Sequence, residues 1–264
     1  LMVDSVTVWL EWRNRDSAIY VCEGTYEERG EAGSALQQRE HQFVVDLTTL
    51  VELARLDFIE PALRRLGRPL VPASVKEELL LTKQFATEQL AAGVMVENEG
   101  SVQFAEIPPE YHAKRKALLE KIESAMNQFC EIVPVLGPDV LPDQLVQVQS
   151  FLDSRAIDII SLCLEKNATL VTEDGGFRRL AQACGVARTA WLQPLLTQLR
   201  NEGTISPDSY SKAILGKYML RHQLTSISGD DLLWAANRNR EEVVDDARAA
   251  LTALASPTID IESG

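Results

Sequence analysis

The chain has 264 residues, an ordinary share of apolar residues and a formal net charge of −13 at pH 7. Affinity for nucleic acid comes largely from Lys and Arg side chains that neutralise phosphates, so this charge excludes strong unaided binding over the whole surface. A nucleic-acid role would need a local basic patch, a metal ion or a partner.

No apolar run in the sequence reaches the length of a membrane span, and no signal peptide is evident, so we expect no membrane partner. The four cysteines show no CxxC pair or other metal-type spacing, which indicates a reducing, cytoplasmic compartment. Leu1 precedes Met2, which indicates either a domain cut from a longer protein or the remnant of a tag.

The first 40 residues are predicted to form a β-hairpin and a linker. Apolar and polar residues alternate over 6–11, a turn signal lies at 14–16, and a second apolar run covers 18–22. The stretch 23–40 is rich in Gly, Glu, Arg and Gln, which is typical of a linker or a long exposed loop.

A short apolar run at 43–45 predicts a buried strand, and Asp46 follows it directly. Apolar residues at helical spacing come next, with Thr48 or Thr49 as the helix cap. Strand, acid and helix thus follow one another, and the acid lies where a parallel strand would end.

A second strand is predicted at 70–71, followed by a helix over 75–90. Ser74 and Glu77 have the spacing of a capping box, which gives Glu77 a structural role. The neighbouring Glu78 lacks such a role. It either faces the edge of the sheet or is a solvated helix charge.

An insertion is predicted over 93–131, made of a small hairpin and a long helix. The stretch 132–141 is rich in Pro and Gly and indicates a loop or a short strand. A helix over 154–166 follows, with Asp153 or Ser154 as its cap. Asp158 lies in the first turns of this helix beside large apolar residues, an odd place for a carboxylate unless it points at the edge of the sheet.

The strand–acid–helix pattern recurs at 168–184, where Thr172 and Asp174 follow a buried strand. Both residue types also favour helix N-caps, which is the alternative interpretation. In one parallel sheet, Asp46 and Asp174 would meet at the same edge. Two like charges repel there unless a cation is present, which suggests a divalent metal ion.

The rest of the chain is predicted to be helical apart from an edge strand at 186–187. We expect an α/β domain with a central parallel sheet over 41–237. An acidic helix and a tail would occupy 238–264.

The order of these motifs resembles the PIN-domain family of metal-dependent nucleases over about residues 41–190. The resemblance rests on Phe-Val-Val-Asp at 43–46, on Pro-Ala-Ser-Val-Lys-Glu-Glu-Leu at 72–79 and on Leu-Val-Thr-Glu-Asp at 170–174. It extends to the PIN module of large bacterial proteins that also carry tetratricopeptide repeats and a Gre-factor-like domain. The resemblance implies a three-layer α/β/α sandwich in which carboxylates hold Mg²⁺ or Mn²⁺ and RNA phosphodiesters are hydrolysed.

Carried over residue by residue, Asp46 matches the first acid of the family, Glu78 the second and Asp174 the last. Thr172 matches the hydroxyl residue before the last acid. Hard oxygen ligands of this kind suit Mg²⁺.

The third acid departs from the family pattern. The family usually has an Asp at the position of Ala156 in this chain, so either Asp158 or Asp153 would have to take that role.

Two alternatives to an active endoribonuclease remain open. One is a catalytically silent PIN-like module that binds a regulatory protein or another part of its own parent chain. The other is a different phosphate-handling α/β protein such as a phosphatase or a receiver domain.

Overall fold

The structure is a computed structural model of the chain. It describes residues 24–38, 40–88, 93–98, 101–106, 109–137, 140–219, 226–237 and 260–261. The predicted hairpin before residue 23 and the predicted acidic helix after residue 240 lie outside these ranges.

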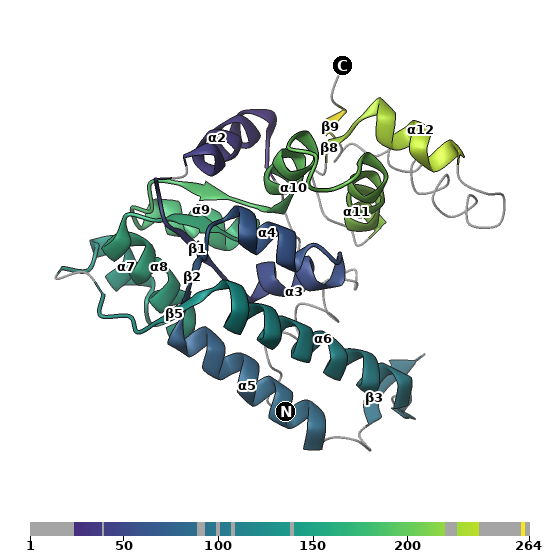
Figure 1. The fold of residues 1–264 in the computed structure, drawn as a ribbon. Helices are drawn as coiled ribbons and strands as arrows, with labels where there is room; N and C mark the ends of the chain where they lie inside the picture. The colour runs from purple at the N-terminus through teal and green to yellow at the C-terminus, as the bar shows by residue number, and fades with distance from the viewer. Residues whose placement is uncertain are drawn as a thin grey trace.

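A five-stranded parallel sheet forms the centre of the molecule, with strand order β5-β2-β1-β6-β7 (Figure 1). Its strands are β1 (Phe43–Val45), β2 (Leu70–Pro72), β5 (Glu131–Val133), β6 (Thr169–Val171) and β7 (Thr189–Ala190). Every residue of β1, β2 and β6 is buried, as expected for strands covered on both faces. Because the strands are parallel, their carboxyl ends share one edge.

Helices cover both faces of this sheet and complete a three-layer α/β/α sandwich, which confirms the predicted fold class (Figure 1). One layer contains α3 (Leu47–Arg55), α4 (Ile59–Arg65) and α6 (Pro109–Phe129). The opposite layer contains α7 (Asp143–Val148) and α8 (Ser154–Lys166), and α8 packs against β1 and β2. Two further helices lie beyond strand ends: α5 (Ala73–Glu88) follows β2 directly, and α9 (Gly175–Ala183) begins after residues 172–174, which follow β6.

The inserted hairpin is confirmed as β3 (Gly93–Asn98) and β4 (Ser101–Glu106), which pair antiparallel before α6. The last sheet strand, β7, lies three residues later than predicted. After it come α10 (Leu192–Asn201), α11 (Pro207–Met219), β8 (Ser226–Ile227), α12 (Gly229–Asn237) and β9 (Asp260–Ile261). Within the described residues, no helix is both long enough and apolar enough to cross a bilayer.

The prediction of a linker over 23–40 is wrong, because α2 (Tyr26–Gln37) occupies most of it. Thr25 and Glu28 form a capping box that begins the helix. Only three side chains of α2, those of Ala32, Ala35 and Leu36, are buried. The apolar stripe is therefore too narrow to stand out in the sequence, while packing beside β7 and α10 holds the helix in place.

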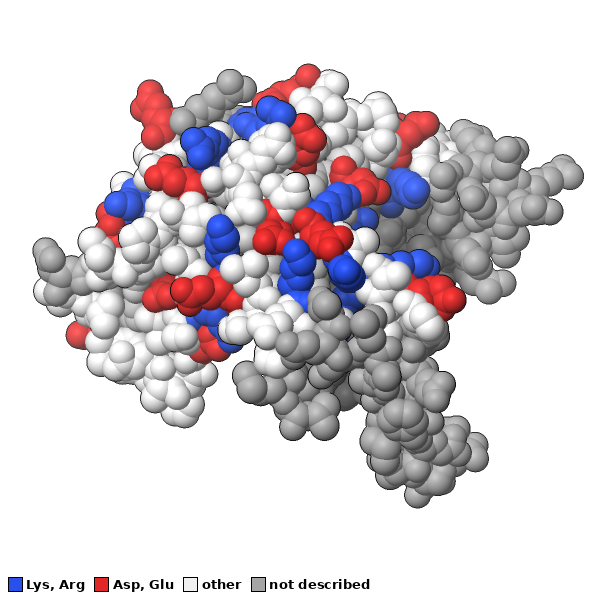
Figure 2. Space-filling view, turned by 60° about the horizontal axis from the view of Figure 1, so that its bottom comes forward, with Lys and Arg blue, Asp and Glu red and all other residues white. Residues whose placement is uncertain are grey.

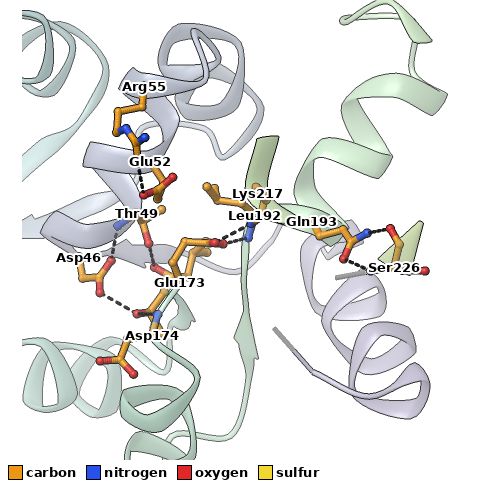
Figure 3. A network of polar contacts seen from close by, with 12 residues as sticks. Asp46, Thr49, Glu52, Arg55, Glu173, Asp174, Leu192, Gln193, Lys217 and Ser226 are labelled. Carbon is orange, nitrogen blue, oxygen red and sulfur yellow. Dashed lines mark hydrogen bonds and ion pairs between the residues drawn. The ribbon is translucent and has the colours of Figure 1, made fainter. Parts of the chain in front are cut away.

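A fully buried ion pair joins the end of β6 to the C-terminal helices. Lys217 on α11 donates to Glu173 Oε2 at 2.6 Å, and both side chains have no exposed surface. The other carboxylate oxygen accepts from the Leu192 backbone at 2.6 Å. Figure 3 shows Glu173 extending away from Asp46 and Asp174 toward Lys217, so this acid has a structural role.

We predict that Lys217→Met lowers the free energy of unfolding by about 3–5 kcal/mol, because the buried Glu173 carboxylate would lose the cation paired with it. The double variant with Glu173→Gln should recover most of the loss. Urea denaturation followed by circular dichroism measures both changes. Lys212 is exposed on the same helix, so Lys212→Met is the matched control. Equal stability of Lys217→Met and Lys212→Met would contradict this account.

Candidate functional site

The first part of the site forms where β1 ends and α3 begins. Asp46 is the N-cap of α3, and its Oδ1 accepts from the Thr49 backbone at 2.9 Å. Its Oδ2 accepts from the hydroxyls of Thr48 at 2.7 Å and of Thr172 at 2.6 Å. Asp46 is only 5% exposed, so its carboxylate is held in one position by neighbouring groups of the protein rather than by water.

Thr172 and Asp174 follow the end of the neighbouring strand β6. Figure 3 shows Asp174 on the segment beside Asp46. Thr172 Oγ1 donates to Asp46 and accepts from the Asp174 backbone at 3.2 Å. Asp174 caps α9 through Phe177 N at 2.9 Å. A Cβ on Gly176 would lie 3.2 Å from Asp174 Oδ1, so a glycine leaves that carboxylate room. We call Asp46, Thr172 and Asp174 the Asp46 cluster.

The capping interpretation is confirmed for Asp46 and Asp174, which also lie at the ends of neighbouring strands at one edge of the sheet; their role as metal ligands stays a prediction. The two strand ends are further tied by Thr49, whose hydroxyl donates to the Val171 carbonyl at 3.1 Å. This bond fixes the first turn of α3 against β6.

Burial raises the pKa of Asp46, and the hydrogen bonds from Thr172, Thr49 and Thr48 oppose that rise without cancelling it. Burial, together with the charge of Asp46, also raises the pKa of the Cys163 thiol on α8. The negative charge of Asp46 thus lies in surroundings that disfavour it, and a cation nearby would stabilise it.

Asp158 lies on the other side of β1, near the end of β2. Its Oδ2 accepts from the Ser74 hydroxyl at 2.5 Å, and the side chain is half-buried. The predicted capping box of Ser74 and Glu77 is wrong, because α5 begins at Ala73 and the Ser74 hydroxyl donates to Asp158 instead.

Glu78 is 7% exposed and forms an ion pair with Arg155 Nη1 at 2.9 Å. Asp153 caps α8 through the Arg155 backbone at 2.9 Å and accepts from Arg155 Nε at 2.5 Å. The bond to Arg155 lowers the pKa of Asp153. That same bond, followed by the charge of Glu78, raises the pKa of Arg155. We call Glu78, Arg155 and Asp153 the Arg155 cluster.

Topology places both clusters on the same edge of the sheet. Helix α5 leaves the carboxyl end of β2, and α8 returns from the end of β5 to the start of β6, so its first turn lies at the carboxyl edge. Ligand crevices of parallel α/β sheets form at this edge.

Hard oxygen donors fit a divalent cation in kind. In the part of the chain that the structure describes, however, no three His, Cys, Asp or Glu side chains are grouped closely enough to hold a metal ion. The metal site formed by Asp46, Glu78, Asp158 and Asp174 therefore stays a prediction.

The sequence analysis did not identify Arg155 and Ser74 as residues that contact the acids at this edge of the sheet. The only signal for Arg155 was its place between two candidate acids, and Ser74 was assigned to a different bond. Their partners, Glu78 and Asp158, are remote in sequence, so local spacing could not reveal these contacts.

One family model matches the chain, over residues 44–183, and it is described as a PIN domain associated with the TPR-GreAB-C-PIN system. The match begins in β1 and ends with α9, so it contains both clusters. Searches of curated proteins and of solved structures find no match.

We predict that Asp46→Asn leaves the metal-free domain at least as stable as the wild type at pH 7. The raised pKa of Asp46 means that ionisation of this carboxyl destabilises the fold, and asparagine removes the charge while keeping a cap for α3. The stability gained should shrink as the pH falls toward 3.8, where the wild-type carboxyl is also protonated in the unfolded chain.

Thermal melts between pH 4 and pH 8 measure this effect, with Asp208→Asn at the exposed start of α11 as control. A variant that is less stable at pH 7, with a deficit that grows with pH, would show instead that the charged form of Asp46 stabilises the fold.

Proposed function

Because the chain belongs to the PIN-domain family, we propose that it is a metal-dependent endoribonuclease that hydrolyses RNA phosphodiesters with Mg²⁺ or Mn²⁺. The observation that carries the proposal is the Asp46 cluster, in which two acids meet at adjacent strand ends and are locked by the Thr172 hydroxyl.

Asp46 and Asp174 are the residues that would hold the metal first, with Glu78 and Asp158 completing the set and Asp153 as the alternative third acid. A divalent ion bound there would supply an activated water and offset the charge on the leaving oxygen. Thr48 and Thr172 keep Asp46 oriented through its Oδ2. Asp174 is held by its cap bond, so its position needs little reorganisation.

A bound cation would also reduce the electrostatic repulsion between this acidic chain and an RNA substrate. The chain carries a net charge of −13, which repels a polyanion at a distance. The face brought forward in Figure 2 intersperses Lys and Arg with Asp and Glu. Lys83 on α5, for example, pairs with Glu123 on α6. On this face, RNA contact would therefore depend on the site itself or on a partner rather than on a broad basic surface.

The Arg155 cluster favours a second candidate function, that of a catalytically silent PIN module. Arg155 already supplies a positive charge to Glu78, as a metal ion would. The family is described by its association with a TPR and Gre system, so the partner in that case would be a neighbouring domain or a protein with such repeats.

We also propose a cytoplasmic location. Cys130, Cys163 and Cys184 are free thiols, the state expected of cysteines in a reducing compartment.

The nuclease proposal predicts that the protein cleaves a generic single-stranded RNA in the presence of Mn²⁺ and that EDTA stops the reaction. Asp46→Asn and Asp174→Asn should each lower the rate by roughly 100-fold or more, the scale of losing a group that stabilises charge at the reacting centre. Gel analysis of end-labelled RNA measures the rates.

Asp208→Asn is the matched control and should cleave at the wild-type rate. Intact RNA at high protein concentration with Mn²⁺, together with a stable complex with a TPR-containing protein, would favour the silent module instead.

A further inference from the structure

Arg155 is the one described arginine that bridges two of the acids predicted to form the metal site. Its Nη1 lies 2.9 Å from Glu78 Oε1, and its Nε lies 2.5 Å from Asp153 Oδ1. Nη2 also contacts Asp153 Oδ2, so the guanidinium is hydrogen-bonded to Asp153 through two nitrogens. The contact of Nη1 with Glu78 is an ion pair without hydrogen-bond geometry. A planar guanidinium suits this arrangement and an ammonium does not.

The position of Arg155 in its helix indicates that the carboxylates determine where the side chain lies. It lies in the first turn of α8, directly after the cap residue and Ser154. The helix dipole disfavours a cation at this end of a helix. Arg155 is therefore held there by the carboxylates and not by the helix that carries it.

Glu78 needs a positive partner because it is buried, and an ionised carboxylate is costly to bury alone. Arg155 meets that need in the metal-free domain. A metal ion coordinated by the same Oε1 would meet the same need, but two cations cannot share that oxygen at full strength because they repel one another.

We propose that Arg155 is a built-in competitor of the metal ion: it neutralises Glu78 in the metal-free domain and has to leave Glu78 before this acid can coordinate a divalent cation. The proposal rests on the proposed function in taking Glu78 as the second acid. The side chain of Arg155 is 33% exposed and that of Asp153 is 50% exposed, so the two can move toward solvent together when Arg155 leaves Glu78. Metal affinity is thereby set by the chain's own arginine as well as by the acids.

The test is the affinity for Mn²⁺, measured by electron paramagnetic resonance and by calorimetry on the full chain. Arg155→Ala should bind Mn²⁺ about tenfold more tightly than the wild type, the change expected when a partly buried ion pair no longer competes. Mn²⁺ should also raise the melting temperature of this variant more than that of the wild type. Neither readout depends on catalysis.

Three further variants make the result specific. Arg155→Gln keeps most of the side-chain length without the charge and should also tighten binding, which guards against poor folding of the alanine variant. Arg64→Ala removes an arginine from an exposed pair with Glu60 on α4 and should change nothing. Adding Glu78→Gln to Arg155→Ala should abolish the gain.

Unchanged or weaker Mn²⁺ binding in both Arg155 variants overturns the proposal, as does the absence of Mn²⁺ binding in every variant. If the wild type cleaves RNA while the Arg155 variants gain no affinity, the competitor role fails and the nuclease stands. If the variants gain affinity but none cleaves RNA, the competitor role stands and the nuclease fails.

Discussion

The hydrogen bond from the Thr172 hydroxyl to the Asp46 carboxylate is the contact on which the site depends. It joins the ends of β1 and β6, two strands that are neighbours in the sheet but distant in sequence. Thr172 also accepts from the backbone of Asp174, so one hydroxyl fixes both acids. The parallel sheet makes this possible because it brings all strand ends to one edge, and the short strands leave the acids directly in the turns that start α3 and α9.

Several buried or half-buried carboxylates lie at this edge of the sheet, where burial disfavours their negative charge. Burial raises the pKa of Asp46, and Glu78 is nearly as buried. Threonine hydroxyls donate hydrogen bonds to the Asp46 carboxylate, and the Arg155 guanidinium supplies a positive charge to Glu78. Glu173, which lies between Thr172 and Asp174 in the sequence, forms its ion pair elsewhere, with Lys217. Charge compensation at this edge is thus local: hydroxyl groups serve Asp46, and Arg155 serves both Glu78 and Asp153.

The sequence was most informative where a pattern is local. A buried run followed directly by an acid and a helix predicted the places of Asp46 and Asp174 at the sheet edge. It was least informative where contacts join remote residues: Ser74 and Asp158 are 84 positions apart, and Glu78 meets Arg155 across two helices. Helix α2 was missed for another reason, since its stability comes from a cap and a narrow packed stripe rather than from strong periodicity.

The most direct measurement of the central claim is a crystal structure of the protein soaked with Mn²⁺, located by its anomalous scattering. We expect one Mn²⁺ peak in contact with the carboxylates of Asp46 and Asp174, and Arg155 turned away from Glu78. A map without a peak at the carboxyl ends of β1 and β6, with Arg155 still 2.9 Å from Glu78, would contradict the account.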